Sequence, residues 1–547
     1  MIFYHISDKI TNRLDYVKIK LMNNQESQLK VWQKSANQQA NFSFIKKLIA
    51  AFPQAEVYLV GGAVRDLILE KSTKDFDFVV AKVEAKELEK FLAREGEVNL
   101  VGKSFGVFKF IPLLSMEGPR GGYESQKKIV SSKAPLNLPL ERGEIIEPFD
   151  IALPRTEQAG MSGGYKDFNI QSDQNLKIES DLSRRDFTIN ALAWDLKNQK
   201  LIDAFDGLKD LENKIIRAIG QPEQRFQEDY TRLLRAIRFA CQLDFTIEPK
   251  TLETIKKKSK KILEITKERI NEEFTKIIMS DNAETGLRLM QLIGLLKILI
   301  PELERGVGMA QNKAHIYEVF DHSVRALGVA TQKNYKLEIR LGALFHDIGK
   351  PVTKEFKDGD ATFYNHDQEG AKITKQILKR LNYSNDIIKD VVHLVRYHMF
   401  YYALDTVTDA GVRRLLNRIG KDNVDDFINL RICDRLGMGR PKAKPWKLIQ
   451  LERRFKEVQL DPITPKMLKV TGHDVISELK IKPGPKIGLL LNALLGEVLE
   501  DPDKNSKKYL ITRLKELNKL KDSELVKKHP DTAFYEEERK RLLHAQK

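Results

Sequence analysis

The order of hydrophobic and polar positions divides the chain into a strand-rich part and a helical part. Between residues 55 and 195, short runs of β-branched and aromatic residues predominate, such as Val57–Val60, Val107–Ile111 and Phe149–Leu153, and runs of this kind are typical of β-strands. From about residue 196 onward, apolar residues recur at spacings of three and four, the pattern of amphipathic helices. The pattern predicts an α+β protein, in which a small head with a mixed β-sheet and helices precedes a long all-α body.

Three segments lack this periodicity. Residues 1–40 are polar and weakly patterned, which predicts an N-terminal extension. Residues 114–145 are rich in Gly, Pro, Ser and Lys, a composition typical of an insertion outside a packed core. The last forty residues are rich in Lys and Glu, which indicates a solvated helix and tail.

The first candidate for chemistry follows the first apolar run. Gly61 and Gly62 come next, then a short amphipathic helix and a second strand that we expect to open with the sequence DFDF at 75–78. Residues two apart on a strand share a face, so Asp75 and Asp77 would project together, and hard divalent cations accept such paired carboxylates. Paired glycines let backbone N–H groups approach a phosphate where the helix begins. Either feature alone also fits a solvated surface, but in this order they predict phosphoryl or nucleotidyl transfer.

A second constellation, Arg184, Arg185 and Asp186, stands just before an apolar segment. Two adjacent arginines suit a triphosphate, because guanidinium groups bind phosphate oxygens in bidentate fashion. A helix N-terminus with a structural ion pair is the alternative that these residues allow.

A third constellation consists of Asp229, Arg232, Arg235 and Arg238, which are spaced three apart and would form one stripe on a helix. Asp229 would accept from the exocyclic amino group of a base while Arg232 donates to the neighbouring ring nitrogen. Cytosine and adenine both present that pair of groups, whereas uracil and guanine present the opposite polarity. Arg235 and Arg238 would bind phosphate or orient the pair. The alternative is a salt bridge between residues three apart on a solvated helix.

Composition narrows the range of partners and compartments. The chain has 547 residues, enough for several domains, and its 93 basic and 77 acidic residues give a net charge of +16. That charge favours a polyanionic partner, either nucleic acid or an anionic membrane. The two cysteines, Cys241 and Cys433, fit a reducing cytosol. No apolar run reaches the roughly 18 residues of a membrane span, so we expect a soluble cytoplasmic protein without a membrane partner.

Five motifs follow one another in an order that is specific to one superfamily: LVGGAVRD, the DFD pair, RRDFTINALA, LIDAFDGLKDLENKIIRAIG and EDYTRLLRAIRFA. Together they resemble the class II tRNA nucleotidyltransferases, which include the CCA-adding enzymes and the bacterial poly(A) polymerases. The resemblance covers roughly residues 55–305 and continues at 483–505.

This resemblance implies roles for the matching residues. Asp75 and Asp77 would hold Mg²⁺ ions, which activate the RNA 3′-hydroxyl and neutralise the leaving pyrophosphate. Asp229 and Arg232 would be the template that selects CTP or ATP. The nucleotide-binding residues that we expect are Gly61, Gly62, Arg65, Arg185, Asp229, Arg232, Arg235 and Arg238.

Three further residues follow from the chemistry or from the resemblance. A third carboxylate would suit the transfer, and Asp150, in an alternating strand, is the catalytic candidate. Arg155 and Glu157 resemble the RxE element of the family. They precede a Gly-rich stretch at 159–168 that would be the flexible loop of CCA-adding enzymes.

Histidines are concentrated in one part of the helical body. Six of the ten lie between residues 315 and 398, and His and Asp side chains that converge from separate helices make a transition-metal site. The motif HDIGK and its spacing resemble the HD phosphohydrolase superfamily. The ligands that this resemblance implies are His322, His346, Asp347 and Asp434, with His366 and His398 at a second metal or a phosphate.

Such a site would hold a divalent transition metal (Mn, Ni, Fe or Co), and the metal would activate water to cleave phosphomonoesters or 2′,3′-cyclic phosphates. The alternative is a helical domain that keeps its histidines for structure. His315 and His393 fall outside the ligand pattern and are expected to be hydrogen-bonding residues.

The sequence therefore predicts a template-independent enzyme that transfers CMP and AMP from CTP and ATP to the tRNA 3′ end, with phosphohydrolase activity as an additional possibility. A poly(A) polymerase or a partial enzyme that adds only CC or only A is the alternative within this chemistry. An HD phosphohydrolase that uses the head as an RNA-binding module is the alternative from another class. The domains that we expect are an extension (1–40), a nucleotidyltransferase head (41–195), a base-recognising neck (196–262), a helical body (263–310), an HD domain (311–460) and an RNA-binding helical tail (461–547).

Overall fold

The structure is a computed structural model that describes residues 42–71, 73, 75–101, 107–113, 148–158, 169–311, 316–357, 359–399 and 407–528. The expected extension (1–40), the insertion (114–145), the Gly-rich stretch (159–168) and His315 lie outside the described residues. The chain divides into two compact units, Met1–Arg269 and Ile270–Lys547, and each is described by itself.

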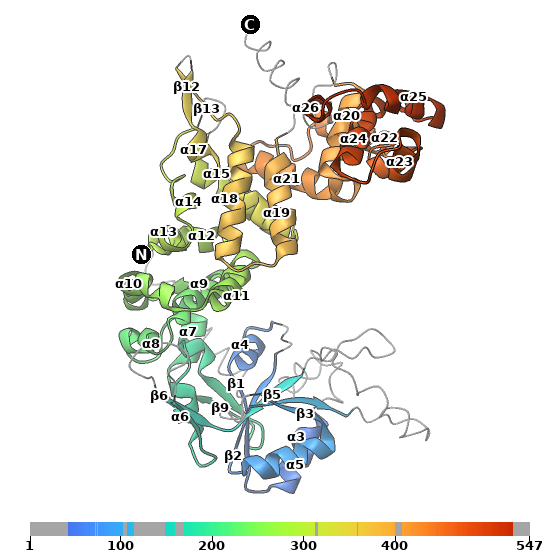
Figure 1. The fold of residues 1–547 in the computed structure, drawn as a ribbon. Coiled ribbons are helices and arrows are strands. Elements are labelled where there is room, and N and C mark those ends of the chain that lie inside the picture. The colour runs from blue at the N-terminus through green and yellow to red at the C-terminus, as the bar shows by residue number, and fades with distance from the viewer. Residues whose placement is uncertain are drawn as a thin grey trace. The chain divides into compact units, whose positions relative to one another are not determined.

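The first unit contains a mixed seven-stranded sheet with the strand order β3-β4-β5-β2-β1-β8-β9 (Figure 1). β2 and β5 are parallel neighbours, and the other neighbouring pairs of this sheet are antiparallel. The predicted mixed sheet is confirmed. Its strands are β1 (Glu56–Val60), β2 (Asp77–Ala81), β3 (Gly96–Val101), β4 (Val107–Pro112), β5 (Phe149–Ala152), β8 (Leu192–Asp195) and β9 (Lys200–Asp203).

β9 extends the sheet beyond residue 195, where the sequence pattern predicted almost uninterrupted helix. A four-residue strand is too short for periodicity to separate it from a helical turn, and here its pairing with β8 decides. Two small pairs of strands complete the β-structure of this unit: β6 (Arg155–Gln158) with β7 (Asn169–Ser172), and β10 (Ile215–Ile216) with β11 (Thr246–Ile247).

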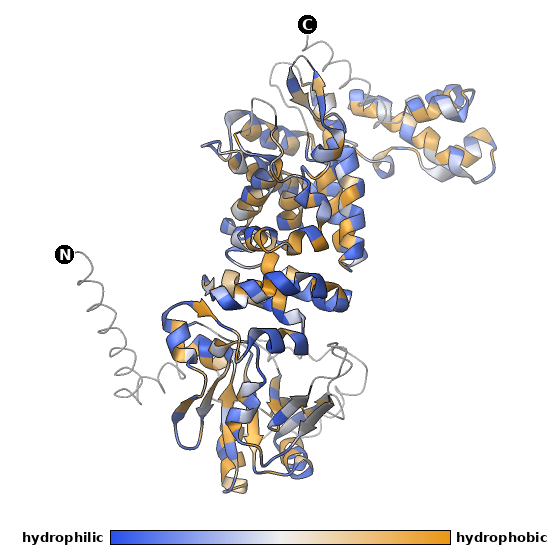
Figure 2. Cartoon of the chain, turned by 90° about the vertical axis from the view of Figure 1, so that its left-hand side faces the viewer, coloured by the Kyte–Doolittle hydropathy of each residue, from blue (hydrophilic) through white to orange (hydrophobic). Residues whose placement is uncertain are grey.

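Ten helical segments of the first unit lie among the described residues. They are α3 (Ser43–Ala51), α4 (Gly62–Ile68), α5 (Ala85–Glu95), α6 (Ile178–Ser183), η2 (Thr188–Asn190), α7 (Gly207–Glu212), α8 (Pro222–Glu228), α9 (Thr231–Leu243), α10 (Pro249–Lys258) and η3 (Ser259–Glu264). Hydrophobic residues gather on the strands, and hydrophilic residues cover the outer sides of the helices (Figure 2).

An aromatic cluster fixes the orientation of the two strands that carry the acidic residues. The rings of Phe76 and Phe78 pack edge-on against Phe149, with centroids 6.2 and 5.8 Å apart. All three phenylalanines are buried. Because side chains alternate along a strand, Asp77 and Asp150 project from the opposite face of the sheet.

The described part of the second unit is almost entirely helical, apart from the hairpin of β12 (Glu355–Lys357) and β13 (Asp360–Thr362). None of the described helices is long and apolar enough to span a membrane. The helices are α11 (Lys267–Ile278, which begins at the end of the first unit), α12 (Ala283–Leu292), α13 (Leu295–Leu299), α14 (Pro301–Glu304), α15 (Val319–Gln332), α16 (Leu337–Phe345), α17 (Lys350–Thr353), α18 (His366–Arg380), α19 (Asn385–Tyr397), α20 (Asp409–Ile419), η4 (Lys421–Asn423), α21 (Val424–Gly437), α22 (Trp446–Val458), η5 (Pro465–Met467), α23 (Gly472–Leu479), α24 (Pro485–Glu500), η6 (Pro502–Lys504), α25 (Lys507–Leu517) and α26 (Asp522–Lys527).

Candidate active site and metal centre

The register of the sheet pairs Asp77 of β2 directly with Asp150 of β5. β2 begins at Asp77, so the expectation that it opens at Asp75 is wrong by two residues; ladder pairing with β1 and β5 starts only at Asp77. Asp75 is exposed just before the strand. The predicted alternation of buried and more exposed side chains is nevertheless present, since Phe76 and Phe78 are both buried.

Negative charge is concentrated around Asp77. Burial raises the pKa of Asp77 above its ordinary value, and the charges of Asp150 and Asp75 act in the same direction against those of Arg185 and Lys109. Lys109, on β4, donates from Nζ to Oδ1 of Asp150 at 3.0 Å. This lysine was not predicted, although its place in the alternating strand VFKF is the signal that puts it on the acidic face.

Gly61 brings an arginine to these carboxylates. Its φ of +73° lies in the left-handed region, and a Cβ at this position would be 2.4 Å from Nη1 of Arg185 and 3.8 Å from Oδ2 of Asp77. Glycine adopts this φ without strain, and a Cβ here would displace the end of the Arg185 side chain. The structure therefore brings together Gly61, Arg185 and Asp77, three of the predicted site residues.

Arg65, on α4, is buried, and its guanidinium group contacts Asn190 of the RRDFTINALA motif. It donates from Nη1 to Oδ1 of Asn190 at 2.7 Å and from Nε to Oδ1 of Asp66 at 2.8 Å. A Cβ on Gly62 would lie 3.6 Å from Nη2 of Arg65, so the predicted phosphate contacts Gly62 and Arg65 are neighbours.

The adjacent arginines Arg184 and Arg185 follow the C-terminal end of α6, so the alternative of a helix N-terminus is wrong in position. The ion pair of that alternative is present: Arg184 Nη2 lies 2.8 Å from Oδ1 of the fully buried Asp181. Arg185 Nη2 is 3.5 Å from Oδ2 of the same carboxylate. Arg184 thus forms a structural ion pair, whereas Arg185 lies beside Gly61.

Asp186 is the centre of a buried network that joins the head to α9. Its Oδ2 accepts from Arg235 at 2.6 Å, and its Oδ1 accepts from Nδ2 of Asn190 at 2.9 Å. Burial opposes ionisation, but Arg235 and Asn190 lower the pKa of Asp186 far below its ordinary value. Because Asn190 also binds Arg65, hydrogen bonds run from α4 to α9 without interruption. Sequence analysis missed Asn190, which lies within the RRDFTINALA motif.

Replacement of Asp186 by Ala is expected to lower the free energy of unfolding by about 3 kcal/mol, because it leaves the partly buried Arg235 without its carboxylate. Urea denaturation measures this loss. The matched control is Glu253→Ala, whose partner Lys257 is exposed and which should cost less than about 1 kcal/mol. A loss below about 1 kcal/mol for Asp186→Ala would contradict the expectation.

The predicted stripe on one helix is interrupted. α8 ends at Glu228 and α9 begins at Thr231, so Asp229 lies between them in an extended conformation, with φ −151° and ψ 106°. Its Oδ1 accepts from the backbone N–H of Thr231 at 2.9 Å, the local bond by which Asp favours helix starts over helix interiors.

The alternative of a salt bridge between Asp229 and Arg232 is also wrong. Oδ2 of Asp229 lies 2.6 Å from Nη2 of Arg269, and Arg232 pairs with Glu228 at 2.5 Å. Arg232 also donates to the backbone oxygens of Arg225 and Arg184. Arg269 was not predicted, because nothing in the sequence links it to a residue 40 positions earlier.

Phe239 of α9 is surrounded by guanidinium groups. The Cζ atoms of Arg238, Arg65 and Arg235 lie 4.3, 5.2 and 5.4 Å from its ring centroid. Cation–π attraction favours this arrangement. The ring therefore supports three of the predicted nucleotide-binding arginines, a role that sequence analysis did not assign to Phe239.

Arg155 and Glu157, the RxE element, both lie in β6. The backbone N–H of Arg155 donates to Oδ1 of Asp181 at 3.3 Å, the carboxylate that also binds Arg184 and Arg185. This bond places the start of β6 beside the two adjacent arginines.

In the second unit, the predicted HD residues come from separate helices and meet. His322 is on α15, His346 and Asp347 follow α16, His366 opens α18, and His398 follows α19; Asp434 is on α21. All six are buried. Among the described residues, only these six bring three candidate ligand atoms within 4.8 Å of one another, in two groups: His322, His346 and Asp434, and Asp347, His366 and His398.

Asp347 lies between the two groups and turns one oxygen to each. Its Oδ2 is 3.4 and 3.3 Å from Nε2 of His322 and His346. Its Oδ1 is 3.5 and 3.8 Å from Nε2 of His366 and His398. One carboxylate can therefore bridge two neighbouring cation positions.

Three of the four histidine rings are oriented as metal ligands usually are. Nδ1 of His346, His366 and His398 each lies 2.7–2.8 Å from the backbone oxygen three residues earlier. A carbonyl at Nδ1 fixes the tautomer in which Nε2 is free to ligate. Burial, with His366 and His346 nearby, holds the pKa of His398 well below its ordinary value, which keeps the ring in the neutral, ligating form.

Two glycines allow the close backbone approaches that assemble this centre. A Cβ on Gly349, two residues after Asp347, would lie 2.1 Å from the backbone oxygen of His366. A Cβ on Gly437 would lie 2.9 Å from the backbone nitrogen of Ala326, where α15 and α21 cross. Each glycine thus brings together two segments that carry candidate ligands.

Charged groups also surround the centre. Lys350 Nζ is buried and donates to Oδ2 of Asp347 at 2.6 Å, and Arg431 Nη1 donates to Oδ2 of Asp434 at 2.6 Å. His393 lies outside the centre, where its Nε2 is 3.0 Å from the backbone oxygen of Ile419.

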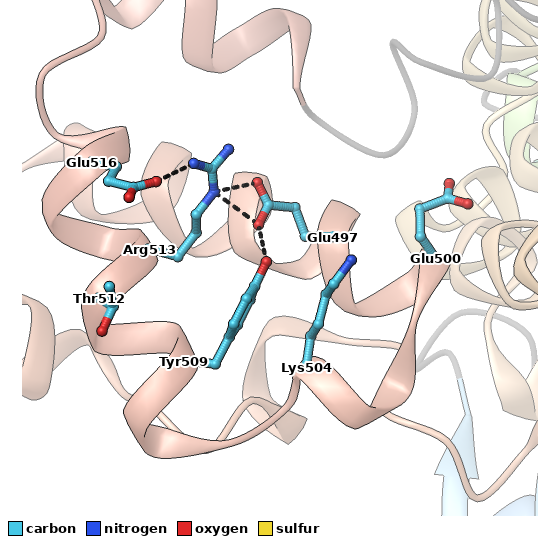
Figure 3. A pocket seen from close by; sticks show the side chains of 7 residues that line it. All are labelled: Glu497, Glu500, Lys504, Tyr509, Thr512, Arg513 and Glu516. Carbon is cyan, nitrogen blue, oxygen red and sulfur yellow. Dashed lines mark hydrogen bonds and ion pairs between the residues drawn. The ribbon is translucent and has the colours of Figure 1, made fainter.

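A separate cavity of about 420 Å³ lies between α24 and α25 (Figure 3). Its central carboxylate, Glu497, accepts from the hydroxyl of Tyr509 at 3.1 Å and from Nε of Arg513 at 2.8 Å. The lining shares no residue with the nucleotidyltransferase site or the HD centre, and its charged residues are held in ion pairs, such as that of Arg513 with Glu497.

Three known protein families match parts of the chain. The family described as the poly A polymerase head domain matches residues 57–112 and 138–217. The probable RNA- and SrmB-binding site of polymerase A matches residues 244–306, and the HD domain matches residues 319–433.

Individual relatives are similar over longer stretches. The A-adding tRNA nucleotidyltransferase of Deinococcus radiodurans is 32% identical over 339 residues, which cover 59% of this chain and 76% of that protein. The CC-adding tRNA nucleotidyltransferase of Thermus thermophilus is 29% identical, with 80% and 89% covered. The multifunctional CCA protein of Acinetobacter baumannii (strain SDF) is 30% identical, with 74% and 89% covered.

The fold has a counterpart among solved structures. The CCA-adding enzyme of Bacillus stearothermophilus in complex with CTP superposes with a TM-score of 0.61 at 22% identity, over 88% of this chain and 97% of that one. The sequence relatives and the matching head and HD families identify the chain as a member of the class II tRNA nucleotidyltransferase family that carries an HD domain.

Proposed function

We propose that this protein transfers CMP and AMP from CTP and ATP to the 3′ end of tRNA, in the cytoplasm, and so adds or repairs the terminal CCA. The observation that carries the proposal is the approach of Arg185 to Gly61 and Asp77, in the same unit as the base-reading residues Asp229 and Arg232. Similarity to relatives that are named for A addition, CC addition and CCA addition supports it.

In the transfer, the RNA 3′-oxygen forms a bond to the α-phosphorus and the bond from that phosphorus to the bridging oxygen breaks, so that pyrophosphate leaves. Asp75 and Asp77 would hold Mg²⁺, which supplies positive charge at the reacting phosphate. The raised pKa of Asp77 fits this role, because a buried carboxylate among like charges gains from a cation. Asp150 has weaker support as a third ligand, since Lys109 already neutralises it.

The chain's own cations would hold the nucleotide. Arg185 would bind the triphosphate beside the backbone of Gly61 and Gly62, and Arg65 would contact it from α4. Asp229 would accept from the amino group of cytosine or adenine while Arg232 donates to the ring nitrogen. Arg235 and Arg238 would support that pair through Asp186 and the ring of Phe239.

A partial enzyme is the second candidate, favoured by the names of two relatives, one A-adding and one CC-adding. A complete and a partial enzyme would use the same template pair, Asp229 and Arg232, since cytosine and adenine offer the same groups. The difference between these activities lies in when addition stops.

An extension assay distinguishes these activities. With Mg²⁺, tRNA transcripts that end at the discriminator base, at C and at CC are given CTP and ATP singly and together. We expect ordered addition of C, C and A followed by termination; the template pair allows both bases, and the point at which addition stops identifies the activity. A stop after CC, or extension only of the transcript that ends in CC, would establish a partial enzyme. Long A tails on unrelated RNA would establish a poly(A) polymerase.

We also propose that the HD centre binds divalent transition metal ions (Mn, Ni, Fe or Co) and hydrolyses phosphoesters at RNA 3′ ends. The residues fit such ions, because imidazole Nε2 atoms and carboxylate oxygens converge, and the Nδ1 contact of a ring such as His346 favours the tautomer whose Nε2 can ligate. His322, His346 and Asp434 would hold one ion, His366 and His398 a second, and Asp347 would bridge them. A bound metal would supply an activated water, and Lys350 would hold the substrate phosphate near Asp347.

A further inference from the structure

The direction of the Asp229 carboxylate is not set by a helix. Asp229 lies in the extended link between α8 and α9, so the regular backbone that usually fixes a side chain relative to its neighbours is missing. Arg232, three residues later, is inside α9. Of the two side chains that would read one base, one therefore projects from an extended segment and the other from a helix.

Separate partners hold the two side chains. Asp229 Oδ2 accepts from Arg269 Nη2 at 2.6 Å, across 40 residues of sequence, and Oδ1 accepts from the backbone of Thr231 at 2.9 Å. Arg232 is anchored by Glu228 and by the backbone oxygen of Arg184. Arg269 thus supplies the side-chain contact that orients the carboxylate. The bonds that hold Arg232 are made by other residues.

These contacts leave Asp229 able to read a base. Each carboxylate oxygen accepts more than one hydrogen bond, so both retain acceptor capacity after binding Arg269 and Thr231. Burial alone would raise the pKa of Asp229, but the hydrogen bond and charge of Arg269 outweigh it and lower that pKa. The group is therefore ionised and acts only as an acceptor, which matches an amino group and rejects a carbonyl.

We propose that Arg269 is a specificity-determining positioning residue: it aims Asp229 so that bases with an amino group are selected over uracil and guanine. The inference rests on the proposed nucleotide transfer and deepens it. Freed from Arg269, the Asp229 side chain would rotate, and its acceptor would no longer stand at a fixed place beside the donor of Arg232. Selection would fall more than the rate of transfer, because the bond of Arg269 is to Asp229, which reads the base, and not to the carboxylates that would hold Mg²⁺.

The test compares Arg269→Gln and Arg269→Lys with the natural protein. Incorporation of each of the four NTPs is measured as kcat/KM on a tRNA transcript that ends at the discriminator base and on one that ends at CC. We expect Arg269→Gln to lower the preference for CTP and ATP over UTP and GTP by about tenfold or more, which corresponds to about 1.4 kcal/mol. Arg269→Lys, which keeps the charge, should restore part of the preference.

The control is Lys276→Gln on the same helix, whose partner Glu272 is exposed and which should leave the preference unchanged. In an Asp229→Ala background, Arg269→Gln should have no further effect on the preference, since it acts through that carboxylate. An equal fall in kcat/KM for all four nucleotides, or an unchanged preference, would overturn the inference. Failure of the natural protein to prefer CTP and ATP would instead refute the proposed function.

Discussion

Replacement of Asp77 by Asn is expected to slow nucleotide transfer by about 1,000-fold or more, equivalent to about 4 kcal/mol of transition-state stabilisation. The substitution keeps the shape of the side chain and removes the charge that would hold Mg²⁺ at the reacting phosphate. Stability should not fall with activity. Burial, Asp150 and Asp75 all raise the pKa of Asp77, so the charged form is disfavoured in the folded protein and its removal relieves repulsion.

Single-turnover incorporation of CMP into a tRNA transcript measures the rate, and urea denaturation measures the stability of the same variant. Asp173→Asn is the matched control, because Asp173 is exposed in the same unit and, among the described residues, its carboxylate accepts from the backbone of Asn175. It should change neither quantity. A loss of less than about tenfold for Asp77→Asn would remove Asp77 from the catalytic residues, and a loss that accompanies unfolding would assign it to structure.

The parts of this site that could be predicted are those written in a local pattern. Alternation of buried phenylalanines with aspartates identifies the acidic face of β2 from a few residues, since side-chain direction on a strand has a period of two. The paired glycines predicted a close approach at the start of α4, and the positive φ of Gly61 shows one physical reason for glycine there. The helical body followed in the same way from apolar residues at three- and four-residue spacing.

The sequence could not identify the hydrogen-bond and ion-pair partners of the site residues. The expected helical stripe assumed one continuous helix. The helix is instead interrupted at Asp229, whose side chain accepts a hydrogen bond from the backbone that follows it. Lys109, Asn190 and Arg269 each meet their partner across 40 or more positions of sequence. No local periodicity records such contacts, because they depend on how strands and helices are brought together.

The HD centre shows the same limit at a finer level. The spacing of histidines and aspartates was sufficient to name its six residues, since the segment that carries HDIGK is unusually rich in them. The place of Asp347 between the two groups was not predictable, because it depends on the rotation of a single carboxylate. Asp347 was assigned with the first ion, and in the structure its two oxygens face different groups.

Replacement of Asp347 by Ala is therefore expected to remove more metal than the loss of any one histidine. The natural protein should bind about two divalent transition metal ions per chain, one for each group. His366→Ala should retain about one, because His322, His346 and Asp434 keep their arrangement. Asp347→Ala leaves the second group with two histidines and takes from the first the oxygen that lies 3.3 Å from His346, so occupancy should fall below one.

Metal content after incubation with Mn²⁺ and desalting, measured by plasma mass spectrometry, tests this order without relying on hydrolysis. His473→Ala is the control, since His473 is exposed on α23 and outside the centre. Nucleotide transfer should persist in all three variants, because the carboxylates that would bind Mg²⁺ for transfer belong to the other unit. Equal losses from Asp347→Ala and His366→Ala would mean that Asp347 belongs to one group only, and that a single carboxylate does not link the two cation positions.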